Sequence, residues 1–588
     1  MASNTGKAFD FELFKRLMSY TRPYKGVFFF VAIAAIAMAC FGVLTPIFLE
    51  GAIDQGISPR NWDMLVYYVS LMIGVLVLEV LFQFGFIFFA NWLGQHVIKD
   101  LRIRLFRHML YFKMTYFDKS AVGRLTTRAV SDIESIASIF SQGLFMIISD
   151  LLKMAVIAGV MLYLSWELAL IVFTILPFLL YATRLFQRAM KSAFEDVRNQ
   201  IANLNTFVQE RLTGMKIVQV FVREEHEYQT FKAINEEHKK AWIKTVWYNS
   251  IFFPIAEISS SIAIGIIVWY GGREAGLGGD ISLGMVTAFI QLAQMFFRPL
   301  RQIADKFNTL QMGMVAANRI FGILDTDSRI EDAGERRLVD TKGQISFEDV
   351  RFGYNQRELV LKGISFDVQP GQTIALVGAT GAGKSTIINL LSRFYEIDGG
   401  TISIDGYSVK DYKLQSLRDN IAVVLQDVFL FADSIYENIT LGDPDIDLAT
   451  VEAAAKKIGV HEFISSLPDG YHYNVKERGS MLSSGQRQLI AFLRAYVSNP
   501  AILILDEATS SIDSYSEELI QKATDTITQG RTSIVIAHRL ATIKKADQIL
   551  VMEAGEIVEQ GTHEELLQKD GGNYKNLYEV QFMAEAAG

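Results

Sequence analysis

Six long apolar runs lie within the first 304 residues of the chain, and they restrict its fold more than any other feature. Each run approaches or exceeds the roughly 20 residues that a helix needs to cross a bilayer. A lipid-exposed segment must satisfy its backbone hydrogen bonds internally, so these runs are expected to be helices. We predict spans near residues 26–49, 64–92, 137–163, 167–186, 247–271 and 282–304.

The composition agrees with a membrane protein that also carries a water-exposed part. Hydrophobic residues make up 50% of the 588 residues and charged residues 20%, which is less charge than a soluble chain usually carries. A chain of this length is too long to fold around a single hydrophobic core, so two or more domains are expected. The net charge of −8 gives no reason to expect a nucleic-acid partner, and the single cysteine, Cys40, excludes an intrachain disulfide.

Positive charge is concentrated in two long polar stretches between spans, residues 93–136 and 184–246. The second stretch holds eleven lysines and arginines, whereas the opposite turns hold little more than Arg60 and Arg273. By the positive-inside rule the long stretches and both termini are cytoplasmic. Residues 187–245 carry apolar positions at helical spacing, so the membrane helices are expected to continue well beyond the bilayer.

Several ionisable residues fall inside the predicted spans, among them Glu79, Asp150, Lys153 and Glu257. Intramembrane carboxylates are candidates for function, and Glu79 and Glu257 have no evident partner in their own sequence neighbourhood. We interpret both as candidate substrate contacts; the alternative is a carboxylate bonded between helices or protonated. Asp150 and Lys153 stand three residues apart, a spacing at which two helical side chains can neutralise each other.

A phosphate-binding pattern stands in the second half of the chain. It follows the apolar run 373–377, expected to be a strand, and precedes the run 387–391, expected to be a helix. It matches G-x-x-x-x-G-K-[ST] in that context, in which backbone amides and the helix N-terminus face phosphate oxygens. Lys384 would pair with the β- and γ-phosphates and Ser385 would hold Mg²⁺. The predicted ATP contacts are Gly378, Ala379, Thr380, Gly381, Ala382, Gly383, Lys384, Ser385 and Thr386.

Further residues at the ends of apolar runs complete a nucleotide site. Asp506 ends the run 501–505 and is placed to hold Mg²⁺ through water, and Glu507 follows where a base must orient water against the γ-phosphate. His538 ends another apolar run and could contact the γ-phosphate. Gln426 could bind Mg²⁺ or water, and the ring of Tyr354 could stack on adenine.

A second anion-binding surface is predicted about 20 residues before Asp506. It offers hydroxyls, a glycine and a helix start, and it consists of Leu482, Ser483, Ser484, Gly485 and Gln486. The chain's own phosphate-binding loop already cradles one set of phosphates. We therefore expect this stretch to bind the ATP that another copy holds.

These motifs together resemble an ABC ATPase. Tyr354, the phosphate-binding loop, Gln426, residues 482–486, Asp506 with Glu507, residues 510–513 and His538 stand in the order A-loop, Walker A, Q-loop, signature, Walker B, D-loop and H-loop. Residues 116–128 and 474–479 resemble the first intracellular loop and the X-loop of bacterial half-transporter exporters of the multidrug and lipid type (type IV). The chain departs from the family at Ser484 and Lys476, where glycine is usual, and at Ser511 and Ile512 of the D-loop, where alanine and leucine are commoner.

The resemblance implies an all-α transmembrane domain of six helices with long cytoplasmic extensions, followed by an α/β P-loop ATPase domain. The expected limits are residues 1–322 for the first domain, 323–342 for a linker and 343–588 for the second. It also implies ATP and Mg²⁺ as ligands, Glu507 and His538 as catalytic residues, and Asp513 in the D-loop. Two chains would pair head to tail, each ATP lying between the Walker A of one and the signature of the other.

The expected function is ATP-driven export of amphipathic small molecules, of the multidrug type, across a bacterial cytoplasmic membrane by alternating access. A dedicated lipid or lipid A-type flippase is the alternative within the class, and an ATP-gated channel or regulator without steady turnover is the alternative outside it. A homodimer is favoured, because the chain has a complete set of ATP-site residues, and the same set would also serve a heterodimer.

Overall fold

The computed structural model describes residues 10–355, 357–506, 514–537 and 539–581. The chain divides into two compact units. The first unit comprises Met1–Leu110 with Ala121–Asp327, and the second comprises Tyr111–Ser120 with Ser328–Gly588. Residues 111–120 were expected within the transmembrane domain, but they group with the second unit, where the Lys113 amide donates to the Ser328 carbonyl oxygen and the Tyr395 hydroxyl donates to Asp118.

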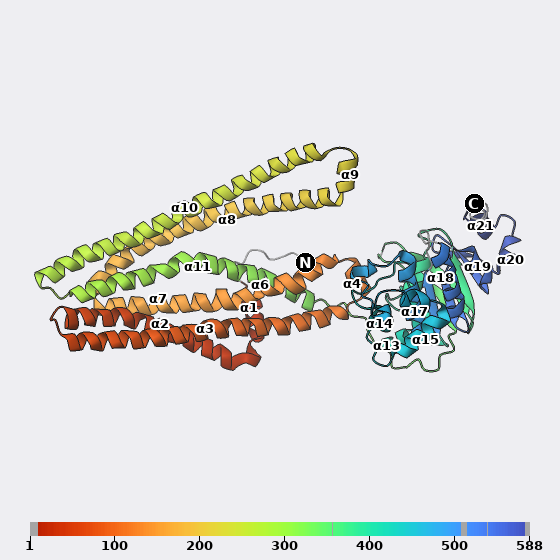
Figure 1. Ribbon diagram of the computed structural model, residues 1–588, viewed down its shortest axis with the longest axis horizontal. Helices are drawn as coiled ribbons and strands as arrows, with labels where there is room; N and C mark the ends of the chain where they lie inside the picture. The colour runs from red at the N-terminus through yellow and green to blue at the C-terminus, as the bar shows by residue number, and fades with distance from the viewer. Residues whose placement is uncertain (1–9, 356, 507–513, 538, 582–588) are drawn as a thin grey trace. The chain divides into compact units, whose positions relative to one another are not determined.

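The first unit is helical throughout its described residues (Figure 1). Six helices of the described chain are long and apolar enough to cross a membrane, and each coincides with one of the predicted spans. Its helices are α1 (Phe11–Ser19), η1 (Arg22–Tyr24), α2 (Lys25–Gly51), η2 (Ala52–Ile57), α3 (Trp62–Leu110), α5 (Val122–Thr127), η3 (Arg128–Asp132), α6 (Ile133–Ser138), η4 (Ile139–Leu144), α7 (Phe145–Leu164), α8 (Trp166–Thr213), α9 (Met215–Val220), α10 (Glu224–Leu277) and α11 (Leu283–Leu324).

Polar caps set the helix limits at the ends where the spans turn. Ser165 caps α8 by accepting a hydrogen bond from the Leu168 amide, and Ser282 caps α11 in the same way. Such caps satisfy amides that have no partner within the helix. Asp54, at the end of the first span, accepts hydrogen bonds from the Ser282 hydroxyl and, at 2.9 Å, from the amide of Gly284. This turn therefore ties the first span to the last.

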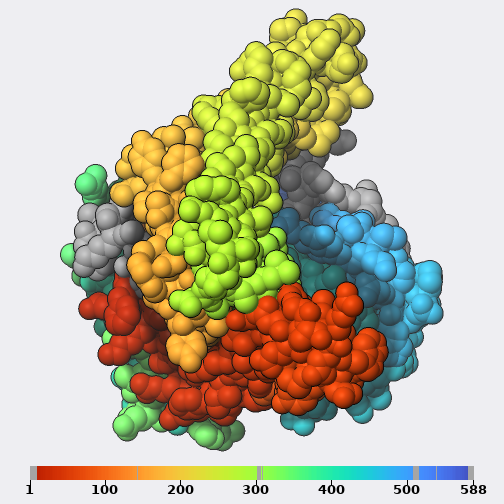
Figure 2. All heavy atoms as spheres, turned by 90° about the vertical axis from the view of Figure 1, so that its left-hand side faces the viewer, coloured from red at the N-terminus to blue at the C-terminus, as the bar shows by residue number. Residues whose placement is uncertain are grey.

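The helices α8 and α10 form a long hairpin that bears α9 at its tip (Figure 1). They pack against each other along most of their length, and near α9 they diverge from the other helices of this unit, as Figure 2 also shows in yellow. This confirms the expectation that residues 187–245 are helical. The tip is apolar and exposed: Ile217, Val220, Phe221 and Val222 are each at least 66% exposed.

The second unit is an α/β domain with two sheets. A four-stranded antiparallel sheet has the order β2-β1-β4-β5, and a six-stranded sheet has the order β10-β9-β3-β8-β7-β6. In the larger sheet only β10 runs antiparallel to its neighbour. The strands are β1 (Ile345–Phe352), β2 (Leu361–Val368), β3 (Thr373–Val377), β4 (Gly399–Ile404), β5 (Tyr407–Ser408), β6 (Ile421–Val424), β7 (Ile502–Asp506), β8 (Thr532–Ile536), β9 (Gln548–Glu553) and β10 (Glu556–Gly561).

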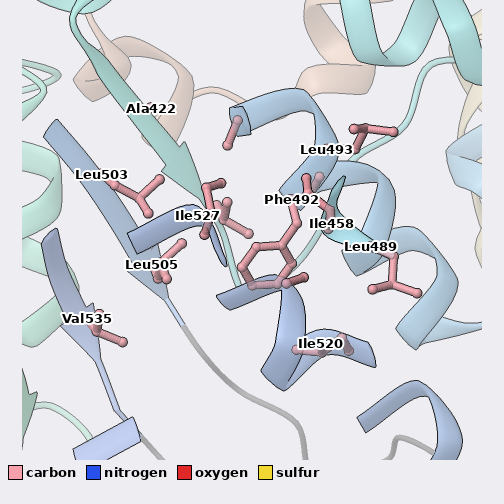
Figure 3. Close-up of a cluster of buried hydrophobic side chains, with 14 of the residues drawn as sticks. Ala422, Ile458, Leu489, Phe492, Leu493, Leu503, Leu505, Ile520, Ile527 and Val535 are labelled. Atoms are coloured by element: carbon pink, nitrogen blue, oxygen red, sulfur yellow. The ribbon is translucent and has the colours of Figure 1, made fainter. Parts of the chain in front are cut away.

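Helices cover the larger sheet. Leu503, Leu505 and Val535 of the sheet meet apolar side chains of α15, α17 and α18, among them Phe492 and Ile520 (Figure 3). The helices of the second unit, in chain order, are α4 (Met114–Asp118), α12 (Lys384–Leu391), α13 (Leu414–Asp419), α14 (Ile435–Thr440), α15 (Leu448–Ile458), α16 (His461–Ser465), η5 (Gly470–His472), η6 (Glu477–Gly479), α17 (Ser484–Val497), α18 (Ser514–Thr528), α19 (Leu540–Lys545), α20 (His563–Leu567) and α21 (Asn573–Gln581).

The order of the strands positions the site. β3 lies between β9 and β8, and β7 lies on the other side of β8. Because these strands are parallel, their carboxyl ends share one edge of the sheet, where ligands of open α/β folds bind. The loop after β3 and Asp506 at the end of β7 therefore lie at the same edge.

Candidate functional site

The phosphate-binding loop runs from the end of β3 to the start of α12 at Lys384. Two glycines shape it. Gly378 has φ +146° and lies so close to the backbone that a Cβ there would stand 2.2 Å from the Met552 carbonyl oxygen. Gly383 has φ +102°, and a Cβ there would stand 2.7 Å from a methyl of Leu361. Both conformations favour glycine, so the loop can curl tightly and present its amides at the helix N-terminus.

Lys384 is buried at this loop. Its Nζ donates hydrogen bonds to the carbonyl oxygens of Gly378, at 2.6 Å, and Ala379, at 3.0 Å. Burial lowers the pKa of the Lys384 ammonium, and the nearby Asp506 carboxylate opposes that shift. A phosphate in the loop would supply the opposite charge that the buried ammonium favours.

Ser385 and Asp506 come together as the sequence predicts. The Ser385 hydroxyl donates to Oδ2 of Asp506 across 3.4 Å. Two neighbouring ligands of an octahedral Mg²⁺ stand about 3 Å apart, and both atoms are the hard oxygens that this ion prefers. The pair therefore fits a magnesium ion shared between the loop and β7. Gln426, the third predicted ligand, follows β6 and is exposed.

Tyr354 stands beside α12, just beyond β1. Its hydroxyl lies 3.3 Å from Oγ1 of Thr386 and accepts a hydrogen bond from Nδ2 of Asn389 at 3.1 Å. The residue keeps 37% of its surface exposed. Its ring is therefore anchored at the hydroxyl end and available to a planar ligand, as a stacking role requires.

Tyr354→Ala is expected to weaken ATP binding about three- to tenfold, the loss of one aromatic stacking contact. Tyr354→Phe is the matched control, because it keeps the ring and should stay within about threefold of the unchanged chain. A fluorescent-nucleotide titration measures both variants. Tripolyphosphate with Mg²⁺ has no base, so an equal loss of its affinity in Tyr354→Ala would contradict the stacking role.

The predicted signature forms the start of α17. Ser483 is the N-cap: its Oγ accepts from the Gln486 amide at 3.2 Å, and the Gln486 side chain accepts from the Ser483 amide at 2.9 Å. Ser483 and Ser484 are exposed, whereas Leu482 and Gly485 are buried. Hydroxyls and the positive end of a 14-residue helix thus face outward, which suits an anion brought by another molecule.

Three predicted residues lie outside the described part of the chain: Glu507, Asp513 and His538. The two D-loop departures, Ser511 and Ile512, also lie there. The structure does describe the X-loop position Lys476, which has φ +59°. This left-handed conformation explains why glycine would be usual there, since a side chain makes it costly.

The ionisable residues of the spans are paired differently from the sequence-based expectation. Asp150 forms an ion pair with Lys306 of α11, and Lys153 forms one with Glu79 of α3, with Nζ and Oε1 3.7 Å apart. The expected Asp150–Lys153 pair is therefore wrong, whereas Glu79 is a carboxylate bonded between helices, the alternative that the sequence left open. A lysine side chain reaches across to a neighbouring helix, and sequence spacing cannot reveal that choice. Glu257 lies exposed on α10.

The sequence also missed one residue beside the nucleotide site. Tyr395, four residues beyond α12, contacts Tyr354 with ring centroids 5.1 Å apart and donates a hydrogen bond to Asp118 at 2.7 Å. Asp118 itself stands in residues 116–128, which the resemblance assigned to the first intracellular loop. No pattern around Tyr395 pointed to its partners, because they lie far away in the sequence.

Comparison with known proteins agrees with this geometry. Residues 28–300 match the family model of the ABC transporter transmembrane region, and residues 361–510 match that of the ABC transporter. An uncharacterized ABC transporter ATP-binding protein, YknV, of Bacillus subtilis (strain 168) is 37% identical over 98% of this chain and 96% of its own. The putative ABC transporter ATP-binding protein exp8 of Streptococcus pneumoniae serotype 4 is 37% identical over 97% of this chain and 98% of its own.

A third relative carries a more specific name. The ATP-dependent lipid A-core flippase of Thiobacillus denitrificans is 34% identical over 97% of this chain and 98% of its own length. The two family matches and the full-length relatives agree with the helical unit, the α/β unit and the phosphate-binding loop described above. The chain therefore belongs to the ABC transporter family, as a multi-pass membrane protein in which a transmembrane domain and an ATP-hydrolysing domain that powers transport share one polypeptide.

Proposed function

We propose that two copies of this chain form an exporter of amphipathic small molecules, of the multidrug type, in a bacterial cytoplasmic membrane. ATP with Mg²⁺ binds at composite sites and drives alternating access. Both termini and the two long polar stretches are cytoplasmic, as their positive charge favours. The observation that carries the substrate class is the mixed sign of the charges inside the spans.

Two acid–base pairs are found among these charges, Glu79 with Lys153 and Asp150 with Lys306, which stands just beyond the last predicted span. Their side chains keep between 16% and 27% of their surface exposed. A Cβ at Gly42 of α2 would lie 3.1 Å from Nζ of Lys153 and 3.2 Å from Oε1 of Glu79. The first pair thus occupies space that this glycine leaves between α2, α3 and α7.

Each pair is neutral overall, so the two pairs present polar groups without one dominant sign. Such a surface suits amphipathic molecules with a small polar group of either sign, together with apolar surface. A substrate with a strongly anionic head would instead favour an excess of basic groups. The paired charges therefore favour an exporter with a broad range of substrates rather than one that carries a single class of lipid.

The tip of the α8–α10 hairpin supports pairing with a second chain. Ile217, Val220, Phe221 and Val222 form an exposed apolar surface on and beside α9. A contiguous apolar surface of this kind marks an interaction site. We assign the ATP-hydrolysing domain of the second chain as its occupant. The exposed signature serines likewise lack a ligand unless another chain brings one, and a second identical chain brings a complete phosphate-binding loop.

A dedicated lipid flippase is the second candidate, because relatives over the full length are named ATP-dependent lipid A-core flippases. The two candidates share the same ATP cycle and differ in cargo. A comparison of amphipathic drugs with lipids therefore separates them.

The test uses the chain purified alone and reconstituted into liposomes. We expect ATPase activity without any other protein, stimulation by both cationic and zwitterionic amphiphiles, and ATP-dependent uptake of those compounds into inside-out vesicles. Activity that requires a second, different chain would contradict the homodimer. Stimulation by lipids alone, with ATP-dependent lipid flipping, would identify the flippase instead.

Glu79→Gln tests the substrate assignment. It leaves Lys153 without its carboxylate, so the preference should move from cationic toward anionic amphiphiles by about tenfold, equal to roughly 1.4 kcal/mol. The double variant Glu79→Gln with Lys153→Gln is the matched control, because it is neutral again and should restore the original preference. Half-maximal concentrations for ATPase stimulation measure the shift. An unchanged preference in Glu79→Gln would show that this pair does not face the substrate.

A further inference from the structure

The segment between the second and third spans, Tyr111–Ser120, belongs to the second unit and is called here the first connecting segment. The Lys113 amide donates a hydrogen bond to the Ser328 carbonyl oxygen at 2.6 Å. Phe112 forms a bridge with Arg329, is 6% exposed and packs on Tyr116 with ring centroids 4.4 Å apart. The segment therefore has defined contacts in this unit.

One side chain joins this segment to the nucleotide site. The Tyr395 hydroxyl donates a hydrogen bond to Oδ2 of Asp118 at 2.7 Å, across 277 residues of sequence. Burial, followed by this hydrogen bond, raises the pKa of the Tyr395 hydroxyl well above its usual range. The phenol therefore stays protonated at physiological pH and can keep donating to the carboxylate.

The ring of Tyr395 contacts Tyr354, the residue predicted to stack on adenine. Its ring lies edge-on to Tyr354, with centroids 5.1 Å apart and planes at 88°. Phe352 contacts both rings, at 4.9 Å from Tyr354 and 5.8 Å from Tyr395. The three rings form a closed cluster in which each fixes the orientation of the others. A base stacked on Tyr354 would consequently restrict Tyr395 too.

The backbone at Tyr395 is also held in place. Two residues earlier, the buried Arg393 donates to Oε1 of Glu396 at 2.9 Å and to the Glu331 carbonyl oxygen at 2.8 Å. Tyr354, for its part, is bound to α12 through Thr386 and Asn389. The ring cluster is therefore anchored on both sides, and the Tyr395 hydroxyl is its contact with Asp118.

We propose that Tyr395 is a positioning residue that couples the occupied nucleotide site to the first connecting segment, through its ring contact with Tyr354 and its hydrogen bond to Asp118. This inference rests on the proposed stacking of adenine on Tyr354. Coupling is reciprocal: a nucleotide that orders the tyrosines holds the segment, and a change in the segment alters nucleotide affinity.

A spin label on the first connecting segment tests the proposal without any transported substrate. The single native cysteine, Cys40, is replaced by serine, and Lys119→Cys supplies an exposed labelling site. The full chain in lipid nanodiscs is titrated with a non-hydrolysable ATP analogue, and the change in the label spectrum is recorded. Calorimetry on the same samples measures the dissociation constant of the analogue.

Tyr395→Phe keeps the ring cluster and removes only the hydroxyl. At saturating analogue we expect its label response to fall about fivefold or more, the lower end of typical coupling factors, while its analogue affinity changes by no more than the same factor. The matched control is Tyr407→Phe in the same unit, whose ring lies under Arg336 with the guanidinium 3.7 Å from the centroid. This control should leave both quantities unchanged.

Asp118→Ala tests the same hydrogen bond from its acceptor side. It should reduce the change in the label spectrum as Tyr395→Phe does, and the double variant should show no further reduction. Additive losses would overturn the proposal. It would also be overturned by an unchanged response in Tyr395→Phe, by no response in the starting protein, or by a loss that merely parallels analogue affinity. Because no cargo is present, failure of the substrate assignment would leave these outcomes unaffected, and the Tyr354 variants report on the stacking role separately.

Discussion

Glu507→Gln is expected to lower steady-state ATP hydrolysis by at least 10²-fold, the usual contribution of a general base. ATP binding should persist, because glutamine keeps the shape of the side chain and leaves the phosphate-binding loop intact. The expectation rests on sequence position: Glu507 directly follows Asp506, which lies beside Ser385 at the carboxyl end of β7. Phosphate release and nucleotide binding are measured on the same reconstituted protein.

The matched control is Glu553→Gln, at the end of β9 in the same sheet. Glu553 accepts a hydrogen bond from Nδ2 of Asn573 at 3.1 Å, and a glutamine oxygen can accept the same bond. This control should hydrolyse ATP normally. If Glu507→Gln also turned over at the normal rate, another group would have to act as the base.

Paired variants of Lys384 and Ser483 should distinguish a composite site from a site within one chain. Lys384→Ala removes the ammonium at the phosphate-binding loop. Ser483→Asp keeps a good N-cap for α17 and places a negative charge where the signature would meet phosphate. Each change is expected to lower the rate of ATP hydrolysis at the sites it affects by about 10²-fold or more, the scale of losing one electrostatic contact in the transition state.

Dimers of two differently tagged chains give opposite predictions for the two arrangements. If one chain carries Lys384→Ala and the other Ser483→Asp, a composite dimer keeps one intact site and should retain up to about half of the activity. If both changes lie on one chain and the other is unaltered, both composite sites are damaged and activity should fall to about 1%. Sites within single chains would reverse this result. Thr562→Asp, at the capping box of α20, is a control for the added carboxylate and should remain active.

Local sequence patterns were sufficient to predict those elements whose structure depends on residues close together in the sequence. The apolar runs correspond to the membrane helices, because length and hydropathy alone satisfy the requirement for crossing a bilayer. The run before Gly378 is β3 and the run after it is part of α12. The signature starts a helix because a serine and a glutamine three residues later form a capping box.

Partners that are distant in the sequence could not be predicted, because a charged side chain can form an ion pair equally well with any of several oppositely charged residues. Lys153 could have reached Asp150 along its own helix, yet it pairs with Glu79, and Asp150 pairs with Lys306. The choice depends on which helices pack together and on the space that Gly42 leaves between them. The same limit hid the contact between Tyr395 and Asp118.

By itself the sequence predicted the class of protein, from six apolar runs, a phosphate-binding loop and a capped helix start at the signature, all short patterns with a direct physical meaning. Only the tertiary structure decided which parts of the chain act together. It placed residues 111–120 with the ATP-hydrolysing unit, paired the charges of the spans, and joined Tyr354 to Asp118 through Tyr395. Burial and side-chain contact arise between segments that are distant in sequence, so a pattern within one segment carries no information about them.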